Sequence, residues 1–183
     1  MKSDEQLVAC YRDSGRREAL DELTRRHLGR VRAMIYPMVL DGTLADDLTQ
    51  EVFLRVFRGL ASFNGQSRFS TWLYRVAMNT TSGFLSRRRR SRVDFRAELP
   101  CDCRSSVERP ESSVMDIELQ TAVEIALGEL PPKLRAAIVL ITLDGMDAGE
   151  AARIEGCSRP TMYWRLHEAR KRLKQRLKGH VSP

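Results

Sequence analysis

A chain of 183 residues that is 42% hydrophobic and 30% charged has the composition of a globular protein of one domain or two small ones, and disorder throughout is excluded. Its formal net charge of +7 and isoelectric point of about 9.6 favour a polyanionic partner, either nucleic acid or an anionic membrane surface. A solvated basic surface gives the same net charge. Whether the chain binds a polyanion therefore has to be judged from the positions of its basic residues.

The hydrophobic pattern predicts an all-α protein. Apolar residues recur at spacings of three and four over long windows, whereas alternating strand patterns are absent. Ser3 with Gln6 and Thr43 with Asp46 fit a capping box, which marks helix starts. Pro37 lacks an amide hydrogen and is expected to kink or end its helix near the C-terminus. In the first half of the chain, helices are expected over residues 4–13, 16–40, 43–60 and 69–88.

The helix expected over 43–60 has an acidic outer face near its start. Asp46, Asp47, Gln50 and Glu51 are spaced three and four residues apart, so they share one side of a helix and can meet a basic partner. The same pattern also suits a solvated face that benefits from the positive end of the helix dipole. By itself this face leaves both interpretations open.

The helix expected over 69–88 carries an aromatic, a basic and an amide residue away from its inward stripe. These are Trp72, Arg75 and Asn79, and such a face can stack with and hydrogen-bond to unpaired bases. Taken alone, Trp72 is more typical of a core or rim residue. The run Arg87, Arg88, Arg89 and Arg90 follows directly, and an isolated arginine run is usually a solvated tail.

Periodicity is lost after this helix, in a stretch that contains prolines and several serines. The stretch predicts a flexible linker between two small helical domains, with boundaries at 1–94, 95–112 and 113–183. Ser113 with Asp116 gives a further capping box. In the second domain, helices are expected over residues 114–129, 132–144, 148–154 and 159–178.

The end of the chain has the order short helix, tight turn, long helix. Gly156 suits a left-handed turn and Ser158 can cap the long helix, which together predict a helix-turn-helix. The early turns of the second helix of such a motif enter the DNA major groove. A packed helical hairpin with a solvated basic face is the alternative, and Glu155, which stands where an apolar residue is usual, weakens the match. The candidate contacts are Ser158, Arg159, Pro160, Thr161, Tyr163, Trp164, Arg165, His167 and Arg170.

Four segments of the chain resemble extracytoplasmic-function sigma factors of the sigma-70 family, in the family's order. DDLTQEVF at 46–53 and FSTWLYRVAMN at 69–79 are similar to the family's second region, while LPPKLR at 130–135 and TMYWRLHEAR at 161–170 are similar to its fourth region. The resemblance implies a factor that guides core RNA polymerase to promoters and catalyses nothing by itself. It covers nearly the whole chain apart from the linker.

The resemblance also implies roles for the candidate residues. The acidic helix would dock on the clamp coiled coil of the polymerase β′ subunit, with further contacts to the β subunit. The fourth region would read the minus-thirty-five element of promoter DNA, although Pro160 departs from the small residue that many relatives have there. An anti-sigma factor is implied as a further partner. For the minus-ten element the implied residues are Trp72, Arg75 and Asn79, a base pocket at Phe63, Asn64 and Gln66, and phosphate contacts at Arg87 to Arg90.

Two other classes of function stay open on the sequence. A helix-turn-helix repressor or activator would dimerise through its first domain, but this leaves the first region unexplained. A nuclease or recombinase would need clustered carboxylates or a nucleophile with a base, and no such motif is recognisable. No cofactor and no metal ion are expected.

Cysteines and hydropathy give the remaining expectations. Cys10, Cys101, Cys103 and Cys157 match neither a disulfide framework nor a zinc-ribbon spacing. They are interpreted as reduced thiols, with metal or redox sensing by Cys101 and Cys103 left open. No stretch approaches the ~18 apolar residues of a membrane span, and the N-terminus does not look like a signal peptide. The expected location is the cytoplasm, without membrane contact.

Overall fold

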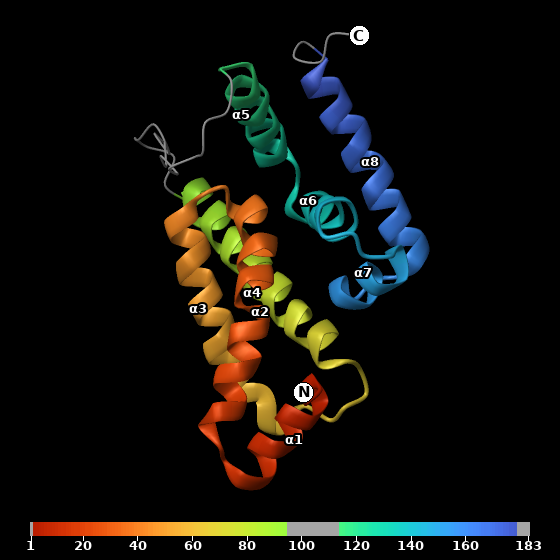
Figure 1. Ribbon diagram of the computed structural model, residues 1–183. Coiled ribbons are helices and arrows are strands. Elements are labelled where there is room, and N and C mark those ends of the chain that lie inside the picture. The colour runs from red at the N-terminus through yellow and green to blue at the C-terminus, as the bar shows by residue number, and fades with distance from the viewer. Residues whose placement is uncertain (1, 95–113, 179–183) are drawn as a thin grey trace.

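The computed structural model describes residues 2–94 and 114–178, and these residues form helices and turns without a strand. The all-α prediction is therefore confirmed. The chain folds into two groups of helices (Figure 1). The first group holds α1 (Asp4–Ser14), α2 (Arg17–Val39), α3 (Gly42–Gly59), the 3₁₀ turn η1 (Leu60–Ser62) and α4 (Phe69–Asp94). The second group holds α5 (Val114–Glu129), α6 (Pro132–Ala137), the π-helical turn η2 (Ile138–Leu143), α7 (Ala148–Glu155) and α8 (Arg159–Leu177).

The capping boxes met different outcomes. At α1 the box is confirmed, because the Gln6 amide donates to Ser3 Oγ at 3.2 Å and the Ser3 amide donates to Gln6 Oε1 at 2.9 Å. The box at Thr43 is wrong, since α3 begins at Gly42 and Asp41 caps it by accepting from the Leu44 amide at 3.0 Å. A carboxylate at this position also gains from the helix dipole. The box at Ser113 lies outside the described residues.

The end of α2 agrees with the sequence-based expectation, whereas α4 and the segment that follows α6 differ from it. α2 continues through Pro37 to Val39, and Leu40 closes it in the left-handed conformation with its amide donating to the Tyr36 carbonyl at 2.7 Å. α4 runs on to Asp94, so the arginine run belongs to a helix. The helix expected over 132–144 is α6 followed by wider π turns, in a segment whose β-branched residues crowd a regular helix.

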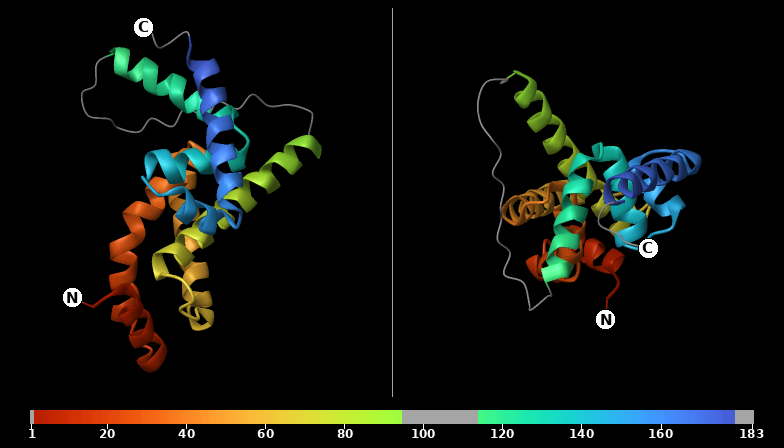
Figure 2. Two further views of the ribbon diagram at one scale, coloured as in Figure 1. Left: turned by 90° about the vertical axis from the view of Figure 1, so that its right-hand side faces the viewer. Right: turned by 90° about the horizontal axis from the view of Figure 1, so that it is seen from above.

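The two groups of helices pack against one another through one continuous apolar core. α4 lies along α7, and α2 contacts α5 and α6 (Figures 1 and 2). Arg135 of α6 is buried at this junction and donates to the carbonyl oxygens of Met38, at the end of α2, of Gly128, in the last turn of α5, and of Leu130, just after α5. A guanidinium is well suited to the unpaired carbonyls at the C-terminus of a helix. The segment predicted to be the linker, 95–112, lies outside the described residues, as do Cys101 and Cys103.

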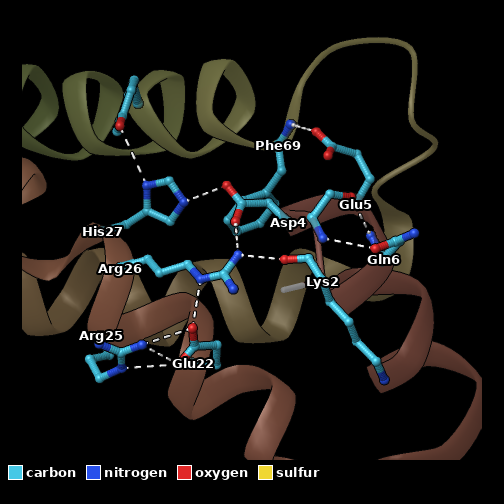
Figure 3. A network of polar contacts seen from close by, with 11 residues as sticks. Lys2, Asp4, Glu5, Gln6, Glu22, Arg25, Arg26, His27 and Phe69 are labelled. Carbon is cyan, nitrogen blue, oxygen red and sulfur yellow. Dashed lines mark hydrogen bonds and ion pairs between the residues drawn. The ribbon is translucent and has the colours of Figure 1, made fainter.

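A polar network fixes α1 against α2 and α4 (Figure 3). The Asp4 carboxylate accepts from Arg26 at 2.9 Å and from His27 Nε2 at 2.8 Å, while the other imidazole nitrogen lies 3.4 Å from the Tyr74 hydroxyl. His27 is 9% exposed, and buried polar groups are stable only when they are hydrogen-bonded. This histidine of α2 therefore links α1, through Asp4, to α4, through Tyr74.

Candidate nucleic-acid and partner interfaces

The acidic face of α3 is exposed, and its four residues are not equally free. The carboxylate of Asp46 pairs with Arg32, and that of Glu51 accepts from Arg55 Nε at 2.6 Å. These neighbouring guanidinium groups lower the pKa of both carboxyls. Asp47 and Gln50 are exposed and have no such partner among the described residues. A protein that binds this face would therefore find Asp47 and Gln50 available at once.

Sequence reasoning missed one member of this face. Leu54 is 49% exposed and follows Gln50 by one helical turn, so its side chain continues the side of α3 on which Asp47 and Gln50 lie. The sequence contained a signal for this exposed leucine. Phe53 and Val56 belong to the inward stripe of the helix, and Leu54 lies between them and outside that stripe. An exposed leucine beside acidic groups gives this face both an apolar and a charged part.

The aromatic residues expected to meet DNA at the start of α4 are partly used by the fold. Phe63 is only 5% exposed, and its ring centroid lies 6.0 Å from that of Phe69 and 5.3 Å from that of Trp72. Trp72 is half-buried and packs so closely that a β-carbon at Gly59 would approach its ring to 3.3 Å. Of the three residues expected to face outward, only Arg75 and Asn79 are thus fully exposed. Trp72 is half-buried because its ring packs against the buried ring of Phe63.

Arg75 and Asn79 differ in what they contact. Arg75 donates from Nη2 at 2.6 Å and from Nε at 3.2 Å to the backbone carbonyl of Arg153, which belongs to α7. Asn79 lies one turn further along α4, is exposed, and has no hydrogen-bond partner in the described part of the chain. The second group of helices therefore occupies Arg75 and leaves Asn79 open.

Other candidates on the first group of helices are near the surface. Asn64 and Gln66 are exposed in the loop before α4, where Asn64 Oδ1 accepts from the Gln66 amide at 3.2 Å. On the last described turns of α4, Arg87, Arg89 and Arg90 are exposed and Arg88 is half-buried. These arginines lie at the end of α4 remote from the loop (Figure 1).

α7 and α8 form the expected helix-turn-helix. Asp147 caps α7 by accepting from the amides of Gly149 at 2.7 Å and Glu150 at 3.1 Å, and these hydrogen bonds lower the pKa of its carboxyl. Gly156 adopts φ 61°, a conformation that costs glycine little. Ser158 caps α8 by accepting from the Thr161 amide at 3.3 Å, and the two hydroxyls lie 2.8 Å apart. Ser158 and Thr161 are thus already engaged in starting the helix.

The outer side of α8 has an aromatic front and a basic rear. Tyr163 is 51% and Trp164 is 62% exposed, and the Arg159 guanidinium lies 5.7 Å from the centroid of the Tyr163 ring. Pro160 and His167 are exposed on the same side, and Pro160 stands in the first turn, where it is tolerated. Further along the helix, exposed basic residues follow: Arg170, Lys171, Arg172, Lys174 and Arg176.

Arg165 belongs to a buried ionic cluster and does not lie on the outer side. Its guanidinium and the Lys133 ammonium each lie 3.1 Å from Glu155 Oε2, and the Glu155 side chain is 1% exposed. The cluster joins α6, α7 and α8. Glu155 looked like a mismatch in the sequence, yet here it holds the long helix on the short one. Sequence reasoning missed this role because the pairing residues are far apart in the chain.

The described residues show neither a metal-binding cluster nor a membrane-spanning helix. Within 2–94 and 114–178, the side chains of His, Cys, Asp and Glu form no group of three that could hold a metal ion. Over the same residues, no helix has the length and apolar character needed to cross a bilayer.

Comparisons with known proteins match both halves of the chain. The family model of Sigma-70 region 2 matches residues 23–91, and that of Sigma-70, region 4 matches residues 121–173. The chain is 32% identical over 173 residues to the ECF RNA polymerase sigma-E factor of Escherichia coli strain K12, which covers 91% of this chain and 90% of that protein. It is 33% identical over 162 residues to the ECF RNA polymerase sigma factor SigE of Mycolicibacterium smegmatis, which covers 88% of this chain and 63% of that protein.

Solved structures show the same arrangement of helices. CnrH in complex with the cytosolic domain of CnrY matches with a TM-score of 0.70 and 23% identity over 98% of this chain and 100% of that chain. The sigma factor RpoE of Bartonella quintana in complex with the anti-sigma factor NepR matches with a TM-score of 0.69 and 24% identity over 86% of this chain and 96% of that chain. At this level of identity, the likeness concerns the fold.

Proposed function

The chain belongs to the extracytoplasmic-function sigma factors of the sigma-70 family, and from this premise we propose that it binds core RNA polymerase and directs initiation at specific promoters. Family models for regions 2 and 4 match in order, and the two matched parts carry an acidic face, an exposed amide and a basic recognition helix. The observation that carries the proposal is the combination of both regions in one chain. We further propose that the factor acts in the cytoplasm, where transcription takes place, and has no enzymatic activity of its own.

We assign polymerase binding to the exposed face of α3. Asp47 and Gln50 offer a carboxylate and an amide without a partner in the described structure, and Leu54 offers an apolar side chain one turn away. A basic helical partner such as the clamp coiled coil of β′ suits this combination, since complementary charge steers association and an apolar contact adds affinity. Before Asp46 and Glu51 can contact the polymerase, Asp46 has to break its ion pair with Arg32, and Glu51 has to break its ion pair with Arg55.

Minus-ten recognition is assigned to α4 and the loop before it. Asn79 can hydrogen-bond to an unpaired base, and Trp72, which is only half-buried, is the aromatic candidate for stacking with a base. Asn64 and Gln66 remain candidates for an extruded base, whereas Phe63 supports the loop from within the core. Arg75 has to leave the Arg153 carbonyl before it can contact DNA, and the exposed residues among Arg87 to Arg90 suit phosphates.

Minus-thirty-five recognition is assigned to α8. Its early turns expose Arg159, Tyr163, Trp164 and His167, and the basic residues behind them suit the DNA backbone. Two modest DNA-binding units that are fixed on one polymerase gain effective concentration at correctly spaced elements. Contacts of this half with the β subunit are part of the same proposal.

We also propose control by an anti-sigma factor. CnrH and RpoE were each solved with such a protein or with a cytosolic partner domain, and their helices follow the same arrangement as in this chain. An inhibitor that covers the α3 face would block polymerase without unfolding the factor. The anti-sigma factor and β′ would then compete for the same exposed side chains, Leu54 and Asp47.

Reconstituted transcription tests the proposal. Purified chain is mixed with bacterial core polymerase and a library of promoter-length duplexes, and transcripts are sequenced to identify any sequence-dependent start. Asp47→Ala is expected to weaken binding to core polymerase about tenfold, whereas Asp46→Ala, whose carboxylate is already paired, should weaken it less. The matched control is Asp13→Ala, an exposed carboxylate on α1. Failure of the wild-type chain to bind core polymerase would refute the function.

A further inference from the structure

The recognition helix carries a continuous apolar strip that its own fold does not use. Inward packing of α8 is supplied by Met162, Leu166 and Ala169, which are at most 7% exposed. Trp164 and Tyr163 lie on the outer side, with Pro160 one turn before them. Single exposed apolar residues are ordinary on a protein surface, but Pro160 stands three and four residues before Tyr163 and Trp164, the spacings at which side chains on a helix are neighbours. Trp164 is the most exposed large hydrophobic residue of the described chain.

The charge around this patch points to DNA as its occupant. Behind it, α8 exposes Lys171, Lys174 and Arg176, and in front of it Arg159 is exposed beside the Tyr163 ring. A protein partner that buried the aromatic patch would bring its own surface against this cationic helix. Duplex DNA satisfies both features at once, because its phosphates meet the basic residues while its base edges meet the front of the helix.

Several neighbouring side chains are not free to read bases. Arg165 is held by Glu155, and the hydroxyls of Ser158 and Thr161 are engaged in the cap of α8. On the early turns of the helix, the exposed indole of Trp164 and the phenol of Tyr163 therefore provide the largest surfaces that remain. The base preference of this helix should therefore depend strongly on contacts that an aromatic ring can make with a base edge in the major groove.

We propose that Trp164, supported by Tyr163, is a specificity-determining residue that reads thymine methyl groups in the major groove of the upstream promoter element. Thymine alone presents a methyl group in the major groove, on C5, where cytosine carries only a hydrogen atom. An indole ring packed on that methyl group removes apolar surface from water on both sides. This inference rests on the proposed minus-thirty-five role of α8 and adds the base that it prefers.

The test removes single methyl groups from the DNA. The best duplex from the library is remade with deoxyuridine in place of each thymine in turn, and the minus-ten region is pre-opened so that melting does not limit binding. Affinity of the polymerase holoenzyme is measured for the wild type, Trp164→Ala, Trp164→Phe and the control Lys171→Ala. At one or two positions, deoxyuridine should weaken wild-type binding about fourfold, the factor for burying one methyl-sized group.

The variants separate the possible outcomes. Trp164→Ala should bind the thymine duplex more weakly and lose its sensitivity to deoxyuridine, and Trp164→Phe should recover part of that sensitivity. Lys171→Ala should weaken binding to all duplexes equally while it keeps the methyl effect. The inference is overturned if no thymine methyl matters, if Trp164→Ala keeps the full methyl effect, or if it weakens polymerase binding without DNA. None of these results touches the proposed function, which fails only if the wild type does not initiate.

Discussion

The two helices proposed to read DNA present their reading surfaces in different states. On α4, Trp72 is packed against Phe63 and Arg75 is bonded to the backbone of α7. On α8, Tyr163 and Trp164 are more than half exposed. The recognition helix is therefore ready for duplex DNA as it stands, whereas α4 lies along the other half of its own chain. Under the proposed roles, the minus-ten surface therefore needs more rearrangement on the polymerase than the surface of α8 does.

The largest expected effect comes from Arg135, which anchors the second group of helices on the end of α2. Replacing Arg135 with methionine keeps much of the packing volume but leaves three carbonyls without their donor. Each unpaired buried polar group costs roughly 1–3 kcal/mol, so the free energy of unfolding should fall by about 3 kcal/mol. Urea denaturation followed by circular dichroism measures this change.

The controls for Arg135 are a conservative variant and a neighbour. Arg135→Lys keeps one cationic donor and should recover part of the loss, whereas Arg153→Met, at an exposed position of α7, should change stability by less than about 0.5 kcal/mol. Burial lowers the pKa of Arg135, but the group stays charged in the neutral range. A loss below about 1 kcal/mol for Arg135→Met would mean that this residue does not anchor the junction.

The second expected effect separates folding from reading within α4. Trp72→Ala should lower the free energy of unfolding by about 2 kcal/mol, because the ring is half-buried among Phe63 and Phe69. Asn79→Ala should change it by less than about 0.5 kcal/mol, because the amide is exposed. Thermal unfolding and promoter opening, followed by permanganate reactivity, are measured on the same two variants. Equal stability of both would show that Trp72 belongs to the surface alone.

Local sequence signals predicted most of the fold. The all-α class, the cap at Ser3 and the left-handed turn at Gly156 follow from residues within four positions of each other. The start of α3 was missed because Asp41 and Thr43 are both competent caps, and the choice between them depends on how the chain leaves α2. The length of α4 was underestimated because the run of arginines resembles a solvated tail. Arginine nevertheless has good helix propensity, and the helix continues through the run.

The candidate site was predictable only where it depends on one helix. The shared faces of Asp47 with Gln50 and of Pro160 with Trp164 follow from helical spacing, and all four residues are exposed in the structure. The burial of Phe63 and the pairing of Arg165 with Glu155 depend on contacts between elements. No periodicity in the sequence reports such contacts, so Phe63 and Arg165 were predicted as DNA contacts from the family resemblance.

The third expected effect tests whether Arg165 supports the recognition helix. Arg165→Ala leaves the buried Glu155 with Lys133 as its remaining partner, and should lower the free energy of unfolding by about 1–2 kcal/mol, because a buried charge loses one of its two partners. Lys171→Ala, on an exposed position of α8, should leave stability nearly unchanged. Combining Arg165→Ala with Glu155→Leu should restore part of the loss. If the double variant is as unstable as the sum of the singles, the cluster does not couple the helices.

The smallest expected effect concerns an ion pair across the two groups of helices. Arg30 Nε and Nη2 donate to the two oxygens of Asp144 at 3.0 and 2.7 Å, and the Arg30 guanidinium lies 5.1 Å from the centroid of the Tyr74 ring. Arg30 is half exposed, so the pair contributes about 1 kcal/mol or less, and salt weakens it. In the closed arrangement the two groups of helices pack together, and in the open one they are separated. Destabilising the closed arrangement by 1 kcal/mol raises the population of the open one about fivefold.

Binding of free factor to a single-stranded minus-ten oligonucleotide measures this release, because the Arg75 guanidinium is freed from the Arg153 carbonyl only after α7 has moved away. Arg30→Ala and Asp144→Ala should each raise the affinity by up to fivefold, and the double variant should add little, since either change removes the same pair. Arg32→Ala is the matched control, because it removes the same charge two residues further along α2 but breaks a pair within the first group. If Arg32→Ala raises the affinity as much as Arg30→Ala, the α4 surface is not held closed by this contact.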